Sequence, residues 1–571
     1  MKVVRRQAYA SPARFPGQHP VLARVYQARG LQLEDELDYS LNRLHSPESL
    51  VGLNVAVGLL AQALRENWRI LVVGDFDADG ATSTALALRC LRAMGARRVD
   101  YLVPDRLTEG YGLSPRLVNR AAERSPELLV TVDNGIASIA GVEAAKARGW
   151  RVIVTDHHLP GEVLPAADAI VNPNLPHCGF PSKHMAGVGV IFYVLVRLRA
   201  TLKEQGWFDA GRSIPNLADF LDLVALGTVA DVVRLDANNR VLVEQGLRRI
   251  RAGRACPGIQ ALLRVASRDP GRAVATDLSF AVGPRLNAAG RLTDMALGIE
   301  CLLSDHADQA LVLAARLDAL NRERRDIEMR MKDEASIMLE SLALADGEGL
   351  PWGLCLFDES WHPGVIGILA SRVKESHHRP TIAFAPADDG QLRGSARSIP
   401  GFHIRDALAA VDSRHPGLLN AFGGHAMAAG LSLAADRLDD FSVAFDGQVR
   451  TLLNADDLEA VILSDGELAG SEFCLEVAEL LQNGGPWGQG FAEPVFDGEF
   501  DLLDRRVLKD LHLKLRLRGS GGAVLEAIWF FAKAEFLQSI PVRLHVVYRL
   551  NVNEYRGIRS PQLQIVDMAA I

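Results

Sequence analysis

Paired cysteines, long hydrophobic runs and net positive charge are all scarce in this chain of 571 residues. The six cysteines are scattered singly without a CxxC pair, which argues against a disulfide framework and against a structural zinc site. The longest apolar stretch, around residues 186–196, is too short to span a bilayer and ends at Arg197. The basic start of the chain lacks the apolar core of a signal peptide, so we expect a cytoplasmic protein.

The net charge of −8 does not by itself favour a nucleic-acid-binding protein. The sum can mislead, because acidic metal ligands offset basic patches elsewhere, so the distribution of charge matters more. At this length the chain should hold several domains. No internal repeat or low-complexity tract is visible in it.

The segment 69–80 is the most informative part of the chain. Its apolar run predicts a buried strand that ends in three alternating carboxylates, Asp75, Asp77 and Asp79. Like charges at this spacing repel one another, and their burial is costly unless a cation neutralises them. Carboxylate oxygens bind divalent metal ions well. The sequence therefore predicts a metal site at the C-terminal end of a strand, where open α/β sheets place their ligands.

Two further predicted strands, 128–132 and 151–155, also end in ligand-type residues. Helices are expected at about 81–95 and 139–148, and this alternation is typical of a parallel sheet with right-handed crossovers. Such strands end at one edge of the sheet, so carboxylates and two histidines should converge there. The side chains that follow the two strands are Asp133, Asp156, His157 and His158.

Two other kinds of site share the aspartate spacing. An EF-hand calcium loop would need a bidentate Glu at its twelfth position, where this chain has Leu86, and it would follow a helix. A haloacid-dehalogenase-type phosphatase uses a DxD after a strand, but it does not explain the sequence DHH at 156–158. A purely structural role would require a separate partner for each acid. The metal site is the favoured interpretation.

The rest of the chain divides into further segments. We expect an N-terminal helical cap over residues 1–65 and the alternating strands and helices over residues 66–235. The apolar segment 217–233 contains Asp231, which follows GTVA in a predicted turn and is a further candidate ligand. Asp222 is expected to be buried in the helix or strand before this turn.

Residues 236–350 are expected to form a helical connector. It includes a long, charge-laced helix from residue 305 to about 343, and the Gly-Glu-Gly turn at 347–349 should end it. A second α/β domain is expected over residues 351–450, and a strand-rich domain over residues 460–571.

A basic strand is predicted within the C-terminal domain. Residues 511–518 alternate between leucine and the polar residues His512, Lys514, Arg516 and Arg518. The basic face would suit a groove that follows a nucleic-acid backbone in a small barrel such as an OB-fold. An ordinary solvated strand face is the alternative.

The motifs GDFDADG, TVDNG and TDHH resemble those of the DHH phosphoesterase superfamily. Within it, GTVADVV, GPRLNAAGR, WHPGVIGILASR, GGHAMAAG and GPWGQGF are similar to the RecJ family of 5′→3′ single-strand-specific DNA exonucleases. The resemblance covers nearly the whole chain. It implies an α/β parallel-sheet DHH domain, joined by a long helix to a second α/β, DHHA1-like domain, and a C-terminal β-barrel of the OB type.

The resemblance implies hydrolysis of phosphodiester bonds with two Mn²⁺ or Mg²⁺ ions. Asp133 would be the best candidate to bridge both ions. Asp75 would be a ligand or a supporting residue, and His158 would contact the scissile phosphate or orient a ligand. The implied metal ligands are Asp77, Asp79, Asp133, His157 and Asp231.

The resemblance also implies residues that bind the DNA strand. Arg285, Asn287 and Arg291 would hold its phosphates near the metal ions, with Arg285 foremost, although a salt bridge is the alternative for Arg291. Trp361 and Phe402 could stack on bases, but core packing is favoured for Phe402. Glycine turns let backbone N–H groups approach a phosphate closely. The expected pocket for the 5′-terminal phosphate comprises Ser395, Arg397, Gly423, Gly424 and His425.

Other functions stay open at this point. A manganese pyrophosphatase, a cyclic-dinucleotide phosphodiesterase or an oligoribonuclease would typically lack a third domain of this kind. A non-catalytic scaffold would be expected to lose the acidic ligands, and an RNA-directed nuclease is open because nothing visibly reads a 2′-OH. By family analogy the partners would be single-stranded DNA, single-stranded DNA-binding protein and a RecQ-type helicase. The expected role is DNA recombination, mismatch repair and base-excision repair at the bacterial nucleoid.

Overall fold

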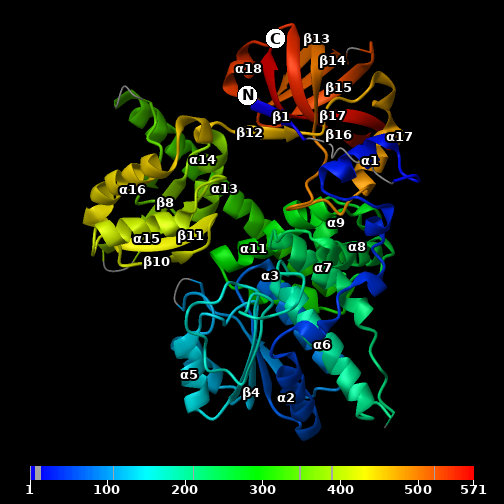
Figure 1. Ribbon diagram of the computed structural model, residues 1–571, viewed down its shortest axis with the longest axis vertical. Coiled ribbons are helices and arrows are strands. Elements are labelled where there is room, and N and C mark those ends of the chain that lie inside the picture. The colour runs from blue at the N-terminus through cyan, green and yellow to red at the C-terminus, as the bar shows by residue number, and fades with distance from the viewer. Residues whose placement is uncertain are drawn as a thin grey trace. The chain divides into compact units, whose positions relative to one another are not determined.

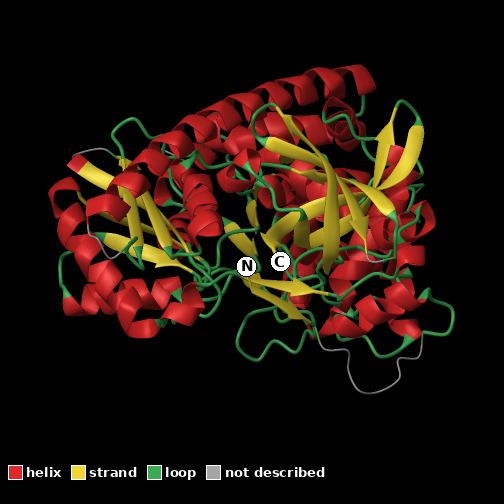
Figure 2. Cartoon of the chain, turned by 90° about the horizontal axis from the view of Figure 1, so that it is seen from above, coloured by secondary structure: helices red, strands yellow, loops and turns green. Residues whose placement is uncertain are grey.

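The computed structural model describes residues 2–6, 15–106, 109–209, 211–345, 349–387, 390–519 and 521–571. The chain divides into two compact units, coloured along the sequence in Figure 1. The larger unit comprises residues 4–319 and 463–571, and the smaller one residues 1–3 and 320–462. Helices and strands alternate in the sheet regions, whereas strands dominate the C-terminal barrel (Figure 2).

The larger unit contains a parallel sheet with the strand order β3-β2-β4-β5-β6. Its central strands are apolar and buried along their whole length, because helices cover both faces. Helices α4 and α5 pack on one face, and α2, α3 and α6 on the other. The strands are β2 (Ile70–Val73), β3 (Val99–Leu102), β4 (Leu128–Val132), β5 (Arg151–Thr155) and β6 (Ala169–Val171). The helices are α2 (Leu53–Glu66), α3 (Ala78–Ala93), α4 (Pro115–Ala122), α5 (Ile139–Ala147) and α6 (Gly187–Glu204).

This sheet confirms the predicted α/β fold with two differences. Strand β3 and helix α4 intervene between the first two predicted strands, and no pattern in the sequence indicated them. Helix α3 begins at Ala78, three residues earlier than expected, because the Asp77 side chain caps it by accepting a hydrogen bond from the Gly80 N–H at 3.0 Å.

A block of helices follows the sheet. Residues 227–230 belong to helix α7 rather than to the predicted turn, and Asp231 is the C-cap of that helix. The long helix α13 lies close to its predicted range; of the glycine turn expected after it, residues 347 and 348 lie outside the described residues. The helices are α7 (Leu221–Ala230), α8 (Ala237–Arg251), α9 (Pro257–Val265), α10 (Ala275–Asp277), the π-helical turn η6 (Leu278–Val282), α11 (Gly283–Leu292), α12 (Ala296–Leu303) and α13 (Ala307–Ala345).

The smaller unit holds the second α/β domain. Its sheet has the order β10-β11-β9-β8-β7, in which only β7 and β8 of the described strands run parallel. The strands are β7 (Leu354–Phe357), β8 (Thr381–Pro386), β9 (Gln391–Arg397), β10 (Ala421–Gly424) and β11 (Ala428–Ala434). The accompanying helices are α14 (Ile366–His377), α15 (Ile404–Arg414) and α16 (Leu438–Leu452).

The C-terminal strands form a closed barrel with the order β13-β14-β15-β17-β16. A parallel pairing between β15 and β17 closes it, which is consistent with an OB-type barrel. Helix α17 (Leu475–Asn483) precedes the barrel, and α18 (Ala534–Gln538) follows β15. The strands are β13 (Phe496–Leu508), β14 (His512–Gly519), β15 (Val524–Trp529), β16 (Arg543–Tyr555) and β17 (Ile558–Ala570).

The N-terminal segment packs on the C-terminal part of the chain. Strand β1 (Lys2–Arg5) pairs with β12 (Val461–Ser464), and the Tyr26 ring of α1 (Pro20–Ala28) stacks on Trp487. No single helix among the described residues is long and apolar enough to cross a membrane. The bent pair Leu41–Ser49 and Leu53–Glu66 passes that test by length and composition alone.

Candidate metal centre

The loop between β2 and α3 brings its carboxylates to the start of a helix. Gly74 and Gly80 allow this turn to be tight: a Cβ at Gly80 would lie 2.6 Å from the Asp75 backbone, and one at Gly74 2.2 Å from Thr84 Oγ1. Asp77 caps α3, and Asp79 lies in its first turn with 1% of its surface exposed. The partial positive charge of a helix N-terminus favours carboxylates at both positions.

Asp79 is held by a second helix N-terminus. Its two carboxylate oxygens accept hydrogen bonds from the backbone N–H groups of Gly187 (2.6 Å) and Val188 (3.0 Å), at the start of α6. A Cβ at Gly187 would lie 2.5 Å from the Asp133 side chain, so glycine is required for this approach. Two helices therefore fix the carboxylate of Asp79 beside that of Asp133.

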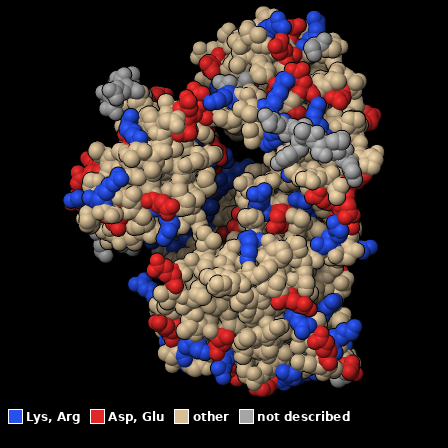
Figure 3. All heavy atoms as spheres, in the orientation of Figure 1, with Lys and Arg blue, Asp and Glu red and all other residues tan. Residues whose placement is uncertain are grey.

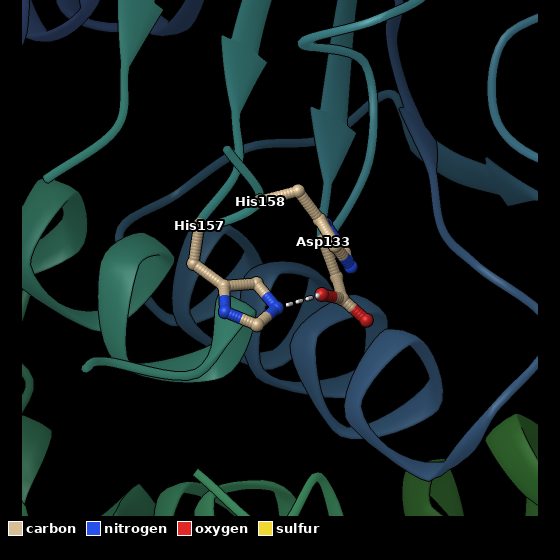
Figure 4. Close-up of side chains that lie close together, drawn as sticks. All are labelled: Asp133, His157 and His158. Atoms are coloured by element: carbon tan, nitrogen blue, oxygen red, sulfur yellow. Dashed lines mark ion pairs between the residues drawn. The ribbon is translucent and has the colours of Figure 1, made fainter. Parts of the chain in front are cut away.

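Asp133 follows β4 and projects toward His157 (Figure 4). Its backbone has φ +62°, a left-handed conformation that aspartate tolerates better than most residues. The side chain is buried, and its Oδ1 atom makes no hydrogen bond with the described residues, although it lies 3.1 Å from His157 Nε2. A buried carboxylate oxygen without a donor is costly unless a cation binds it.

His157 links Asp133 to Asp231. Its Nε2 atom lies 3.5 Å from Asp231 Oδ2, at the end of α7. Asp133 and His157 each belong to two of the three residue groups whose ligand atoms lie within 4.8 Å of one another. The overlap fits two neighbouring divalent ions that share ligands. The groups are Asp133/His157/His158, Asp79/His157/Asp231 and Asp75/Asp77/Asp133.

The electrostatics of the cluster favour the binding of positive charge. Burial, followed by the charges of neighbouring carboxylates, raises the pKa of Asp133 and Asp231 well above the usual range. The same two causes raise the pKa of Asp75 well above its usual value and that of Asp79 to about 7. Without a cation, the charged forms of these carboxyl groups are disfavoured, so the residues present fit divalent metal ions.

Buried Asp156 and half-buried His158 form an ion pair beside the cluster. Asp156 Oδ1 lies 2.7 Å from His158 Nδ1, and its Oδ2 accepts a hydrogen bond from the Ile136 N–H at 2.9 Å. Burial raises the pKa of Asp156, but the hydrogen bond with His158 and the charges of both histidines outweigh it and lower that pKa. Burial lowers the pKa of His158, yet the hydrogen bond and charge of Asp156 raise it to about 9. The pairing with Asp156 therefore favours the imidazolium form of His158.

Helix α11, which carries the motif GPRLNAAGR, supports the acidic loop. Asn287 Oδ1 accepts a hydrogen bond from the Ala78 N–H at 2.8 Å, directly after Asp77. Gly290 packs so closely that a Cβ there would lie 1.8 Å from the Phe76 carbonyl oxygen. Asn287 therefore positions the metal loop through its Oδ1 atom, and its contact with a phosphate stays a prediction. Arg291 is half-buried on the same helix.

The structure also shows where three other predicted DNA-contacting residues lie. Arg285 is 8% exposed, and its guanidinium is engaged with Asp318 Oδ1 (Nε at 2.9 Å) and with the Ala281 carbonyl. Its contact with a DNA phosphate stays a prediction. Trp361 is 2% exposed in the core of the smaller unit, where its Nε1–H donates to Glu334. Phe402 is also a core residue, as favoured from the sequence. Neither aromatic ring is available to stack on a base.

The candidate phosphate-binding residues of the smaller unit come together across its sheet. Strand pairing places Ser395 beside Gly430 and Gly430 beside Gly423, so a strip without large side chains crosses three strands. Arg397 Nη1 lies 3.1 Å from Ser395 Oγ. A Cβ at Gly367, in the first turn of α14, would lie 2.8 Å from Arg397 Nη2. Gly424 and His425 are exposed at the end of β10.

The basic strand β14 has the predicted alternation, with buried leucines and exposed Lys514, Arg516 and Arg518. The neighbouring strand contributes an acid that the local sequence did not reveal: Glu526 lies 3.0 Å from Lys514 and 3.8 Å from Arg516. Acidic and basic side chains are interspersed over the barrel on the face that Figure 3 shows.

Several residues near the cluster were not singled out from the sequence. The Tyr111 hydroxyl lies 3.1 Å from His158 Nδ1 and donates to the Asp133 carbonyl at 3.2 Å. The Arg106 guanidinium lies 4.8 Å from the centre of the Phe76 ring. They come from the segment between β3 and α4, which has no ligand-type spacing. Asp156 stood within the DHH motif but had been given no role.

Comparisons with known proteins agree with this architecture. The family descriptions "DHH family, N-terminal domain", "DHHA1 domain" and "RecJ OB domain" match residues 69–228, 352–451 and 464–567. The chain is 56% identical over 548 residues to the single-stranded-DNA-specific exonuclease RecJ of Dickeya dadantii, covering 95% of each chain. It is 53% identical to that of Escherichia coli, covering 97% of this chain and 96% of the relative.

Solved structures agree as well. RecJ from Thermus thermophilus in complex with Mn²⁺ has a TM-score of 0.79 and 30% identity, covering 97% of this chain and 76% of that one. An exonuclease RecJ bound to manganese has a TM-score of 0.59 and 35% identity, covering 72% of this chain and 97% of that one. On the strength of these sequences and of the cluster at its sheet edge, the chain belongs to the RecJ family of single-stranded-DNA-specific exonucleases.

Proposed function

We propose that this protein is a metal-dependent exonuclease that degrades single-stranded DNA from its 5′ end. The observation that carries the proposal is the cluster of buried carboxylates around Asp133 and His157, whose ligand groups overlap. The role of the RecJ relatives, as their names state it, is single-strand-specific exonuclease activity on DNA.

The metal ligands in this proposal are Asp77, Asp79, Asp133, His157 and Asp231. Mn²⁺ or Mg²⁺ bound there would supply activation of a water molecule and stabilisation of the leaving oxygen. The protein's own contribution is orientation. The N-termini of α3 and α6 fix Asp77 and Asp79, and Asn287 holds the loop between them. Asp133 belongs to two of the three ligand groups. Asp75 would support the loop or complete one ligand set.

His158 would act on the scissile phosphate. Its imidazolium lies beside the cluster, and Asp156 holds the Nδ1 side of the ring, so the remaining edge can interact with a phosphate oxygen. Tyr111, in contact with the same ring, limits its orientation.

Selection of a 5′ end is assigned to the smaller unit. Arg397 and Ser395 would bind the terminal phosphate, with the Gly423–Gly424 strip and His425 beside it. Glycine at these positions leaves room for backbone groups to approach a phosphate. Replacement of Arg397 by Ala should reduce the preference for 5′-phosphorylated over 5′-hydroxyl DNA, whereas Arg393→Ala, on the same strand, should not. An unchanged preference in R397A would remove Arg397 from this role.

A cleavage assay tests the proposed function. A single-stranded oligonucleotide labelled at its 3′ end should shorten stepwise with Mn²⁺ and stay intact with chelator, and a matched blunt duplex should resist. A single-stranded RNA of the same sequence tests whether the enzyme distinguishes deoxyribose from ribose. Turnover of pyrophosphate, cyclic dinucleotides or short RNA without cleavage of DNA would overturn the assigned substrate.

The cellular setting follows from family similarity. We infer a role in DNA recombination and repair in the cytoplasm at the nucleoid, with single-stranded DNA-binding protein and a RecQ-type helicase as partners. Stimulation of degradation of long strands by each purified partner would test this. The bounds of the five segments that the sequence predicts, from the N-terminal cap to the C-terminal domain, likewise stay predictions.

A further inference from the structure

The π-helical turn η6 presents one exposed aromatic ring in an otherwise covered segment. Phe280 is 75% exposed, whereas every other residue from Leu278 to Gly290 is buried or half-buried. Single π-helical turns are rare and occur frequently at functional sites. The turn therefore places a large apolar side chain in solvent where its neighbours all face protein.

This turn borders the metal cluster. The Ser279 hydroxyl, adjacent to Phe280, donates a hydrogen bond to the Val229 carbonyl at 3.0 Å, two residues before Asp231. Gly283, at the other end of the turn, packs on Ala230. The helix continues into α11, where Asn287 holds the loop that carries Asp77. One continuous helical segment thus contacts residues next to Asp231 and next to Asp77, and Phe280 is the exposed residue of its π-helical turn.

A second exposed apolar side chain lies beside the candidate metal ligand Asp231. Val232 directly follows Asp231, is 61% exposed and has φ +61°. A β-branched residue in the left-handed region is strained, and such strain collects at functional sites. An apolar side chain is exposed at this position although the backbone there is strained. This combination indicates that Val232 contacts an apolar part of the substrate.

We infer that Phe280 stacks on a nucleobase of the DNA strand close to the linkage being hydrolysed, with Val232 beside it. This inference rests on the proposed function. The bases are the flat, apolar part of a single-stranded substrate. An unpaired base can stack on a protein ring, whereas a base within a duplex is covered by its neighbours. Stacking on an aromatic ring is tolerant of sequence, which suits an enzyme that must accept each base in turn. Because the cluster binds the phosphates, a ring at its edge can hold the adjoining base and fix the register of the strand.

Abasic substrates provide the test. Wild-type protein and the variants Phe280→Ala, Phe280→Trp and Phe531→Ala are assayed in Mn²⁺ on 3′-labelled single strands, each with one abasic site at a different position near the 5′ end. Phe531 is a matched control, because it is 72% exposed in the barrel of the same unit. We expect one abasic position to slow wild type about tenfold, and F280A to be about tenfold slower on intact DNA with no further loss at that position. F280W should restore both rates and the positional dependence, and F531A should show the wild-type pattern.

The outcomes separate this inference from the proposed function. An F280A protein that cleaves intact DNA at the wild-type rate, or that is slowed further by the same abasic position, would overturn the stacking role while leaving the exonuclease assignment intact. An F280W protein that cleaves normally but has lost the abasic dependence would also contradict it. A wild-type protein that cleaves no DNA would overturn the proposed function and this inference together. Thermal unfolding of each variant in chelator identifies any that fail to fold. If F280A fails to fold, the comparison of F280W with the wild-type protein tests the inference.

Discussion

Two groups of buried carboxylates in the larger unit have opposite surroundings. Near the barrel, Asp465 lies 2.6 Å from Arg29, and Asp497 lies 2.7 Å from Arg5 and 3.0 Å from His545. At the edge of the parallel sheet, Asp133 and its neighbours lie among other carboxylates and beside two histidines. Both groups are removed from water, but Asp465 and Asp497 are paired with arginine, whereas Asp133 lies beside His157 and other carboxylates.

The pKa directions express this difference. Burial raises the pKa of Asp497, but hydrogen bonds from Arg5, Ser464 and His545 outweigh it, so that pKa is lowered overall. Burial and like charges together raise the pKa of Asp133. Burial of an acid therefore does not identify a metal site by itself. The informative feature is a set of buried acids that share no sufficient cation of their own.

The largest effect should come from Asp133→Asn, which removes the carboxylate common to two ligand groups. We expect DNA cleavage to fall by about a thousandfold or more, because metal ions supply several kcal/mol of transition-state stabilisation. Asp497→Asn, in the arginine-paired group, should retain the wild-type kcat. Comparable activity of D133N and wild type at saturating Mn²⁺ would contradict the bridging role.

The same two positions should have opposite effects on stability without metal. Asp497→Ala leaves Arg5 and His545 without their shared acceptor and should lower the free energy of unfolding by about 2 kcal/mol. D133N relieves repulsion in the cluster and should leave the stability unchanged or raise it. Urea denaturation in chelator measures both. Destabilisation of D133N as large as that of D497A would show that the cluster is compensated after all.

The two groups should also respond to pH in opposite directions. Asp79 has a folded-state pKa of about 7, above the value near 4 of an unfolded chain. Its contribution to the stability of the fold is therefore fully present below about pH 4, and it is lost as the pH rises through 7. Asp497 has a lowered pKa, so its contribution is present above about pH 4 and is lost as the pH falls through the folded-state value. Unfolding of the chelated protein between pH 3 and about 8 checks this. Asp79→Asn should flatten the loss at neutral pH, and D497N the loss in acid.

A smaller effect is expected at Asn287, which holds the acidic loop by one hydrogen bond. Asn287→Ala should weaken Mn²⁺ binding about fivefold, since a hydrogen bond of this kind contributes about 1 kcal/mol. Asn551→Ala, in the barrel, also removes a side-chain hydrogen bond and should leave metal affinity unaltered. Isothermal titration compares the two variants. Equal affinities in N287A and wild type would assign Asn287 to some other role.

The smallest effect should be at the basic strand. Lys514→Ala should reduce affinity for single-stranded DNA only a few-fold, because Glu526 already offsets part of the positive charge on this face. The slope of log affinity against log salt concentration should fall by about one phosphate contact. Binding measured over a range of salt concentrations tests it. Lys533→Ala, whose ammonium pairs with Asp567, is the matched control.

The sequence predicted those parts of the fold and site that depend on local patterns. Strand ends that carry Asp77, Asp133 and His157 are visible locally, because buried strands of a parallel sheet are apolar runs and their ends share an edge. Family motifs then supplied the order of the domains. The alternation of β14 followed in the same way from its leucines.

Contacts between distant segments could not be predicted. The pairing of Arg285 with Asp318, 33 positions away, is not visible in the local sequence. Burial of Trp361 depends on the packing of α13 and α14 around it, and neutralisation of Lys514 depends on the neighbouring strand. The arginine partners of Asp465 and Asp497 lie more than 400 positions away, so the sequence alone did not distinguish paired from unpaired acids.

The most direct test of this account is the number of Mn²⁺ ions that the chain binds, measured by titration calorimetry of the full-length protein. The account predicts two ions for the wild-type protein and for D497N, and at most one for D133N. A wild-type protein that binds a single ion, or a D133N variant that still binds two, would contradict the claim that the uncompensated carboxylates form one shared two-metal site.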